Sequence, residues 1–170
     1  MSASISRLTV PTYLRGLRVL ANYLDKAAAH AQSNGLDPDS LVGARLAPDM
    51  LPLSGQIQRA SDTSKNAIAR LLGSESPRME DNEATLDDLK ARIQRTIAYV
   101  QSADAAQLDA AEAREITLTT GKLSRSFDGL GYVLDFALPN FQFHVATTHA
   151  ILRNQGVAVG KLDYLGVDAR

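Results

Sequence analysis

Residues 139–156 limit the fold of this chain more than any other segment, because they contain both a start and a stop signal for one helix. The segment begins with proline, which is favoured in a first helical turn, and ends with glycine, which is favoured just past a last turn. One stripe of side chains recurs at spacings of three and four: Phe141, Val145, Thr148 and Leu152. We therefore expect a helix that buries this stripe against other helices.

Three other segments show the same helical period of apolar residues, namely 4–34, 51–72 and 85–103. Pro11 either opens the first of these helices or kinks a longer one. Thr85 is a cap for the third helix, and two aspartates follow near its positive end. With the helix described first, these segments supply the four members of a helical bundle.

The remaining segments have weaker patterns. Residues 104–113 suggest a short turn of helix, and residues 115–121 alternate with β-branched side chains, which is typical of a short strand. Residues 127–138 read as an irregular lead-in or as one or two helical turns, and the tail 157–170 as an extended segment packed on the bundle. The sequence therefore predicts one all-α domain spanning residues 1–170, a four-helix bundle with a minor strand before its last helix.

Charge and composition argue against several classes of protein. The chain has 18 Lys and Arg against 19 Asp and Glu, a formal net charge of −1, so no basic face supports binding to nucleic acid. It contains no cysteine, which removes disulfides and thiolate metal sites. No apolar stretch approaches the roughly 20 residues that cross a bilayer, and residues 1–9 lack a signal-peptide pattern. We therefore expect a cytoplasmic protein without a nucleic-acid or membrane partner.

The three histidines do not form an evident metal site. His144 and His149 are five positions apart on the expected last helix, which places them about 140° apart around its axis. These two side chains therefore do not share the helix face that binding one metal ion together requires, and His30 lies far away in the sequence. His144 is one residue from the buried stripe, so a hydrogen-bonded histidine at the bundle edge is the simpler interpretation.

Asp49 is the carboxylate with the most distinctive setting, since it lies between Pro48 and Pro52 at the entrance of the second helix. A carboxylate held in such a turn can act as a metal ligand or as a base. It can also cap the second helix, and this is the interpretation that we favour.

Three motifs resemble a known family: L-A-P-D-M-L-P-L at residues 46–53, followed by Gln56; L-P-N-F-Q-F-H-V at residues 138–145; and G-K-L-D-Y-L-G at residues 160–166. The chain is similar to an uncharacterised bacterial domain of unknown function grouped with the DinB/YfiT-like metalloenzymes. The resemblance covers nearly the whole chain. It implies an up-down-down-up four-helix bundle that forms a homodimer.

The resemblance also implies where a site lies. Better understood relatives hold a divalent metal with three histidines, one near the start of helix two and two a turn apart on the last helix. Some of them transfer or hydrolyse groups with low-molecular-weight thiols. In this chain His144 matches one ligand, Thr148 stands where a second is expected, and the entrance of helix two offers Asp49 and Gln56. The implied metal site is therefore incomplete.

Two functions remain open on this basis. The first is a metal-dependent transferase or hydrolase with a degenerate metal site, in which His144 is ligand or general base and Asp49 is its partner. Gln56 and Asn140 then line the cleft as ligand-binding residues, and Tyr13 adds a hydroxyl. The second is a non-catalytic module that binds a small molecule or forms a dimer. The sequence does not decide whether the protein is an enzyme or which cofactor, if any, it uses.

Overall fold

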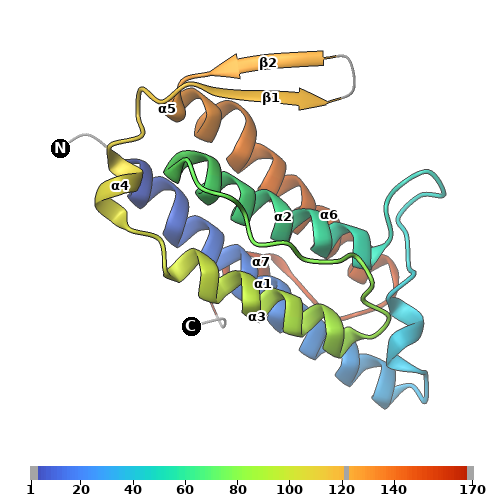
Figure 1. Ribbon diagram of the computed structural model, residues 1–170. Helices are drawn as coiled ribbons and strands as arrows, with labels where there is room; N and C mark the ends of the chain where they lie inside the picture. Colours follow the sequence, from blue (N-terminus) through green and yellow to red (C-terminus); the bar gives the residue numbers. More distant parts are fainter. Residues whose placement is uncertain (1–3, 121–122, 168–170) are drawn as a thin grey trace.

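The computed structural model describes residues 4–120 and 123–167, and four long helices dominate it (Figure 1). These helices are α1 (Ile5–Ser33), α2 (Leu53–Leu72), α3 (Leu86–Gln101) and α6 (Leu138–Asn154). The predicted all-α bundle is confirmed. Within the described residues, no helix combines the length and the apolar character that crossing a bilayer requires.

Side-chain pairs fix the directions of the helices. Helix α1 runs parallel to α6, α2 runs antiparallel to α6, and the start of α3 lies near the end of α1. The pairs that show this are Tyr13 with Phe141, Tyr23 with His149, Gln56 with His144, Thr63 with Asn140, and Asp25 with Lys90. The order is therefore up-down-down-up, and the connection 73–85 has to run back along the bundle before α3 begins (Figure 1).

Local signals explain most helix boundaries. Thr85 accepts a hydrogen bond from the N–H of Asp88, whose carboxylate accepts from the N–H of Thr85, so α3 begins with a capping box. Gly73 ends α2 with φ of 67°, a left-handed conformation that glycine adopts at little cost. Helix α1 begins at Ile5, so Pro11 lies inside it and does not open it.

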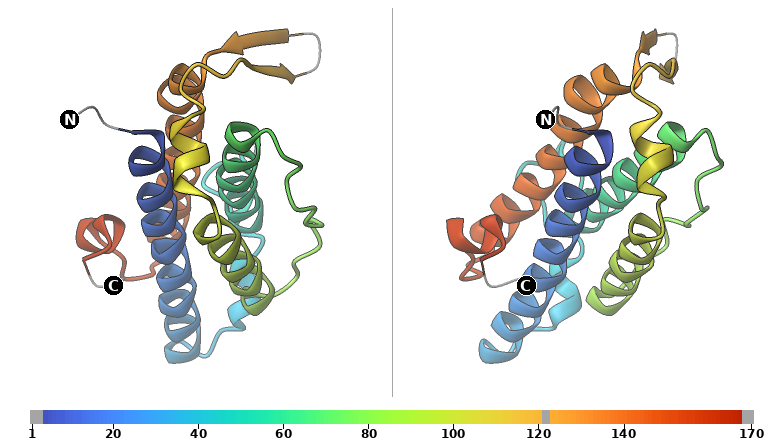
Figure 2. Two further views of the ribbon diagram at one scale, coloured as in Figure 1. Left: turned by 60° about the vertical axis from the view of Figure 1, so that its left-hand side comes forward. Right: turned by 90° about the vertical axis from the view of Figure 1, so that its left-hand side faces the viewer.

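A two-stranded hairpin interrupts the helices. The predicted strand is confirmed as β1 (Ile116–Thr120), while residue 121 lies outside the described residues. It pairs antiparallel with β2 (Leu123–Phe127), with Ile116 opposite Phe127. The sequence pattern did not predict β2, because its residues are mostly polar. The hairpin projects from one end of the bundle (Figure 2).

The remaining elements are short. They are η1 (Pro38–Leu41), α4 (Ala105–Asp109), α5 (Gly129–Tyr132), the π-helical turn η2 (Val133–Ala137) and α7 (Lys161–Leu165). The lead-in to α6 is therefore helical. The prediction of an extended tail was wrong for α7, which forms because Asp163 accepts a hydrogen bond from the N–H of Gly160 at 2.7 Å and so caps the helix. Residues 168–170 of the predicted tail lie outside the described residues.

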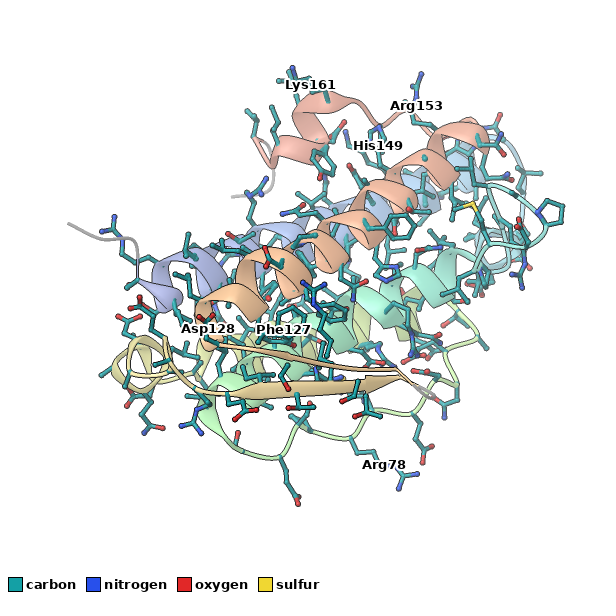
Figure 3. All side chains as sticks on the ribbon, turned by 90° about the horizontal axis from the view of Figure 1, so that it is seen from above. Arg78, Phe127, Asp128, His149, Arg153 and Lys161 are labelled. Atoms are coloured by element: carbon teal, nitrogen blue, oxygen red, sulfur yellow. The ribbon has the colours of Figure 1, made fainter. Side chains whose placement is uncertain are left out.

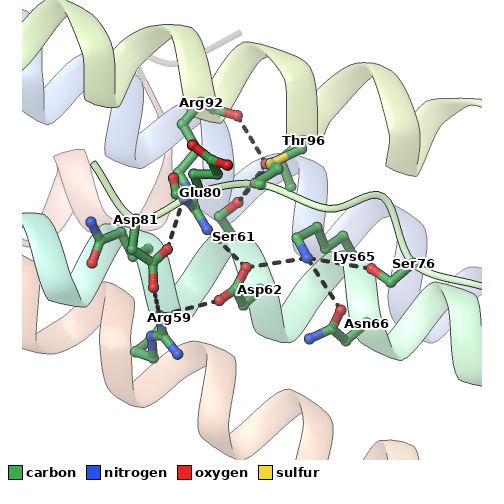
Figure 4. A network of polar contacts seen from close by, with 12 residues as sticks. Arg59, Ser61, Asp62, Lys65, Asn66, Ser76, Glu80, Asp81, Arg92 and Thr96 are labelled. Carbon is green, nitrogen blue, oxygen red and sulfur yellow. Dashed lines mark hydrogen bonds and ion pairs between the residues drawn. The ribbon is translucent and has the colours of Figure 1, made fainter. Parts of the chain in front are cut away.

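The connection 73–85 is held on the bundle by Arg92, which is fully buried on α3. Its guanidinium pairs with Asp62 of α2 at 2.8 Å, and with Asp81 and Glu83 of the connection at 3.0 and 2.9 Å. Asp62 also pairs with Lys65 at 3.2 Å (Figure 4). Because a buried guanidinium needs compensating carboxylates, this network fixes the path of the connection across α2 and α3.

Candidate functional site

His144 and Gln56 form the centre of the candidate site, where α6 packs on α2. Nδ1 of His144 lies 2.8 Å from Oε1 of Gln56, and Nε2 of Gln56 donates to the carbonyl of Leu51 at 3.1 Å. Since the amide nitrogen of Gln56 is used by that carbonyl, its oxygen faces the imidazole and Nδ1 must donate. Neutral His144 therefore has its proton on Nδ1 and a lone pair on Nε2.

The surroundings of His144 keep it neutral. Its side chain is only 9% exposed. Burial, and in second place the positive charge of Arg59, lowers the pKa of His144 to about 4. An imidazole with this pKa is unprotonated at neutral pH, so Nε2 can accept a hydrogen bond there and has no proton to donate.

His144 lines a pocket of about 260 Å³ between α2, α6 and the hairpin. Helix α2 contributes one stripe of polar side chains: Arg59, Asp62, Thr63, Asn66 and Arg70. The opposite wall consists of Asn140, His144, Tyr132, Phe136 and the β1 residues Thr117, Leu118 and Thr119. The pocket is thus a polar trough that follows α2, with an arginine near each end.

The two arginines differ in what they already bind. Arg59 is paired with Asp81 and, at 3.3 Å, with Asp62. Arg70 is exposed, donates to the hydroxyl of Tyr132 at 3.1 Å, and forms no ion pair within the described residues. Arg70 therefore offers the cationic group that a ligand in this pocket can reach.

Aromatic rings build the wall beside Arg70. The rings of Tyr132 and Phe136 stack with centroids 5.9 Å apart, and Phe127 lies 6.1 Å from Tyr132. Phe127 and the neighbouring Asp128 lie where the hairpin joins α5 (Figure 3). Asp128 caps that helix by accepting from the N–H of Gly131. This end of the trough is consequently both aromatic and cationic.

The structure unites some of the predicted site residues and separates others. His144 and Gln56 are in contact, and Asn140 lines the same pocket while donating to Thr63 at 2.9 Å. Asp49 is exposed in its turn and does not line the pocket, so Gln56, and not Asp49, is the partner of His144. Tyr13 is fully buried against Phe141 and does not line the pocket either.

A model of a domain of unknown function, DUF1993, matches residues 5–165. The chain belongs to the DUF1993 family. A crystal structure of a DinB family member from Shewanella denitrificans is 36% identical, with a TM-score of 0.87, and the match covers 95% of this chain and 91% of that one. This DUF1993 protein therefore has a DinB-like fold. A comparison with curated proteins gave no match.

The residues of this DUF1993 protein do not fit the three-histidine metal site that its resemblance implied. Nε2 of His144 has a lone pair that can bind a metal ion, and Gln56 orients the ring, as the hydrogen-bond partner of a metal-binding histidine does. Within the described residues, however, no three His, Asp or Glu side chains are grouped to hold an ion. Thr148 donates its hydroxyl to the carbonyl of His144, and the positive charge of Arg59 acts on the ring. One imidazole beside a guanidinium is a poor site for zinc or nickel.

Sequence reasoning missed Arg59, Arg70 and Tyr132 as site residues. Arg59 and Arg70 share one face of α2 with Asp62, Thr63 and Asn66, and this polar stripe was readable from helical spacing. Without the position of the hairpin, the stripe is indistinguishable from an ordinary solvent-facing side. Tyr132 belongs to the lead-in, and only its contact with Arg70 of α2 shows that it lines the site.

Proposed function

We propose that this protein binds a small organic anion that also carries a hydrogen-bond donor, and that the pocket along α2 is the binding site. The observation that carries the proposal is the Leu51–Gln56–His144 chain of hydrogen bonds, which leaves Nε2 of His144 as an acceptor on a polar pocket. A ligand hydroxyl or amine satisfies that acceptor. A carboxylate or phosphate satisfies Arg70.

Binding is better supported than acid–base catalysis. A general base works best when its pKa lies near the working pH, whereas the pKa of His144 is lowered to about 4. Asp49 does not line the pocket, and the carboxylate of Asp62, which does, is paired with Arg59, Lys65 and Arg92. The residues of the pocket do not supply the three metal ligands that a metal-dependent transferase or hydrolase of this kind needs. The non-catalytic alternative of small-molecule binding therefore agrees best with the geometry.

A matched pair of ligands tests the proposal. We expect 3-(4-hydroxyphenyl)propionate to bind more tightly than 3-phenylpropionate in calorimetric titrations, because only the first has a hydroxyl for Nε2 of His144 and both have a carboxylate for Arg70. His144→Phe should abolish the difference between the two ligands. Arg70→Ala should lower the affinity for both ligands by about fivefold, the effect of one exposed charge. Arg78→Ala should lower the affinity for neither.

Equal affinity of the two ligands for the wild-type protein, or equal effects of Arg70→Ala and Arg78→Ala, contradicts the proposal. Circular dichroism of each variant confirms that the helices remain formed. Arg78 is a suitable control because it is exposed and does not line this pocket.

The homodimer and the cytoplasmic location remain predictions. Phe143, on α6 beside His144, is 56% exposed, and an interface that covered this ring would remove apolar surface from water. Light scattering after gel filtration tests it. A dimer that Phe143→Ser converts to a folded monomer supports the prediction, and a monomeric wild-type protein contradicts it.

A further inference from the structure

His149 lies on a different side of α6 from His144 and has its own buried partner. The hydroxyl of Tyr23 on α1 is 2.7 Å from Nδ1 of His149. Tyr23 is fully buried, and burial raises its pKa, so it keeps its proton and donates to Nδ1. Burial, and then the charge of Arg153, lowers the pKa of His149. Neutral His149 therefore has its proton on Nε2, the opposite tautomer to His144.

Next to this imidazole lies a second pocket, of about 310 Å³, lined by Ala146, His149, Lys161 and Tyr164. Its walls are mainly apolar, since they include a methyl group and two rings. The rings of His149 and Tyr164 are 6.3 Å apart at 80°. The pocket is separate from the one beside His144, because the two share no lining residue.

Helix α7 forms one side of this pocket and is fixed at two points. The hydroxyl of Tyr164 donates to Oε1 of Gln142 on α6 at 3.0 Å. Asp163 pairs with Lys26 of α1 at 2.5 Å. These contacts give the G-K-L-D-Y-L-G motif a role in positioning α7, and they leave the pocket preformed between α6 and α7.

The charges around the pocket favour an anion. Lys161 and Arg153 are exposed on the same side of the bundle as His149 (Figure 3), and neither forms an ion pair within the described residues. The negative charge near His149 is Asp163, which Lys26 neutralises. An N–H donor and the cation of Lys161 thus border an apolar pocket, and Arg153, outside its lining, is near enough for its charge to act on His149.

We propose that this second pocket binds a small carboxylate with a short apolar tail, such as a short-chain fatty acid. The carboxylate accepts from Nε2–H of His149 and lies between Lys161 and Arg153, while the tail covers Ala146 and the ring of Tyr164. Tyr23 is a positioning residue, because it selects the tautomer that donates. This site is independent of the anion pocket along α2 and goes beyond the function proposed for it.

Hexanoate and its neutral counterpart hexanamide test the proposal, with binding followed by calorimetry and by NMR shifts of the histidine rings. We expect hexanoate to bind more tightly than hexanamide and to shift the His149 resonances. The double variant Arg153→Ala/Lys161→Ala should lower the affinity for hexanoate by about tenfold, because it removes two exposed charges that each contribute up to about 1 kcal/mol. Arg78→Ala, which removes a cation from the opposite side of the bundle (Figure 3), should leave affinity unchanged.

Two further variants distinguish this site from the pocket along α2. Arg70→Ala should leave hexanoate binding at wild-type strength, and Tyr23→Phe should weaken it while the fold, checked by circular dichroism, persists. Shifts confined to His144, or loss of binding in Arg70→Ala but not in Arg153→Ala/Lys161→Ala, overturns the second site. The proposal for the α2 pocket is unaffected by either result.

Discussion

Gly16 of α1 lies directly against the ring of Phe141 on α6, and a Cβ at Gly16 would be 2.4 Å from Cε1 of that ring. The two helices approach this closely because glycine has no side chain. The contact places Phe141 in the core, three residues before His144 on the same helix. The position of the candidate site therefore depends on a glycine far from it in the sequence.

Gly16→Ala should destabilise the fold by up to about 2 kcal/mol. Alanine favours the helix by about 1 kcal/mol, but overpacking against Phe141 costs about 1–3 kcal/mol. Urea unfolding measures the difference. Gly43→Ala is the control, since nothing lies within 4 Å of its Cβ position. Equal stabilities of the two variants contradict this packing, and Gly16→Ala/Phe141→Leu should recover part of the loss.

Stability should fall as the pH is lowered from about 6.5 toward 4. The folded pKa of His144 is lowered to about 4, so the unfolded chain binds its proton more tightly and the histidine favours unfolding within this window. After a discount for solvent screening, we expect a loss of about 1–3 kcal/mol at the acid end.

His144→Gln should flatten the dependence in that window, as measured by urea midpoints at several pH values. His30→Gln, which removes an imidazole outside the pocket, is the control. A pH dependence identical in His144→Gln and wild type rules out this role for His144.

Gln56→Glu should raise the pKa of His144 by about 1 to 3, because a carboxylate next to Nδ1 favours the charged imidazolium. NMR titration of the His144 ring measures the change. Gln94→Glu, an exposed position on α3, should have no such effect. A His144 pKa that stays near its wild-type value in Gln56→Glu shows that the Gln56 contact is not maintained in solution.

Arg92→Met should destabilise the protein by about 3–5 kcal/mol, since it leaves the buried carboxylate of Glu83 without its partner and removes the ion pairs with Asp62 and Asp81. Glu83 is the most affected, because its side chain is only 3% exposed. Although burial opposes this, hydrogen bonds from Gln58 and Arg92 lower the pKa of Glu83. Arg95→Met, on the exposed side of the same helix, should change stability little, so similar unfolding midpoints for the two variants contradict the importance of the network.

The purified protein should not retain stoichiometric zinc or nickel after incubation with excess metal and desalting, because His144 is the only imidazole of its pocket. Elemental analysis of wild type beside His144→Ala measures this. Near one equivalent of metal that disappears in the variant contradicts the donor set described here and revives the metalloenzyme interpretation.

The sequence by itself determined the helices of this protein and most of their ends. The stripe of Phe141 and Val145, the cap at Thr85 and the stop at Gly73 act over three or four residues, and such short-range signals are visible along the chain. They sufficed for the all-α bundle. The residues of β2 are mostly polar and show no clear strand pattern. Helix α7 begins with a cap, but the segment around it has no clear helical period of apolar residues.

Only the tertiary structure decided which residues meet. Gln56 and His144 are 88 positions apart, and Tyr23 and His149 are 126 apart. Their contacts set opposite tautomers on two histidines of one helix, which helical spacing cannot predict. Asp49 was the expected partner of His144 in an enzyme, yet its side chain is exposed and does not line the pocket. The physical reason is that helix formation is governed by near neighbours, whereas a binding site is assembled by helix packing across the whole chain.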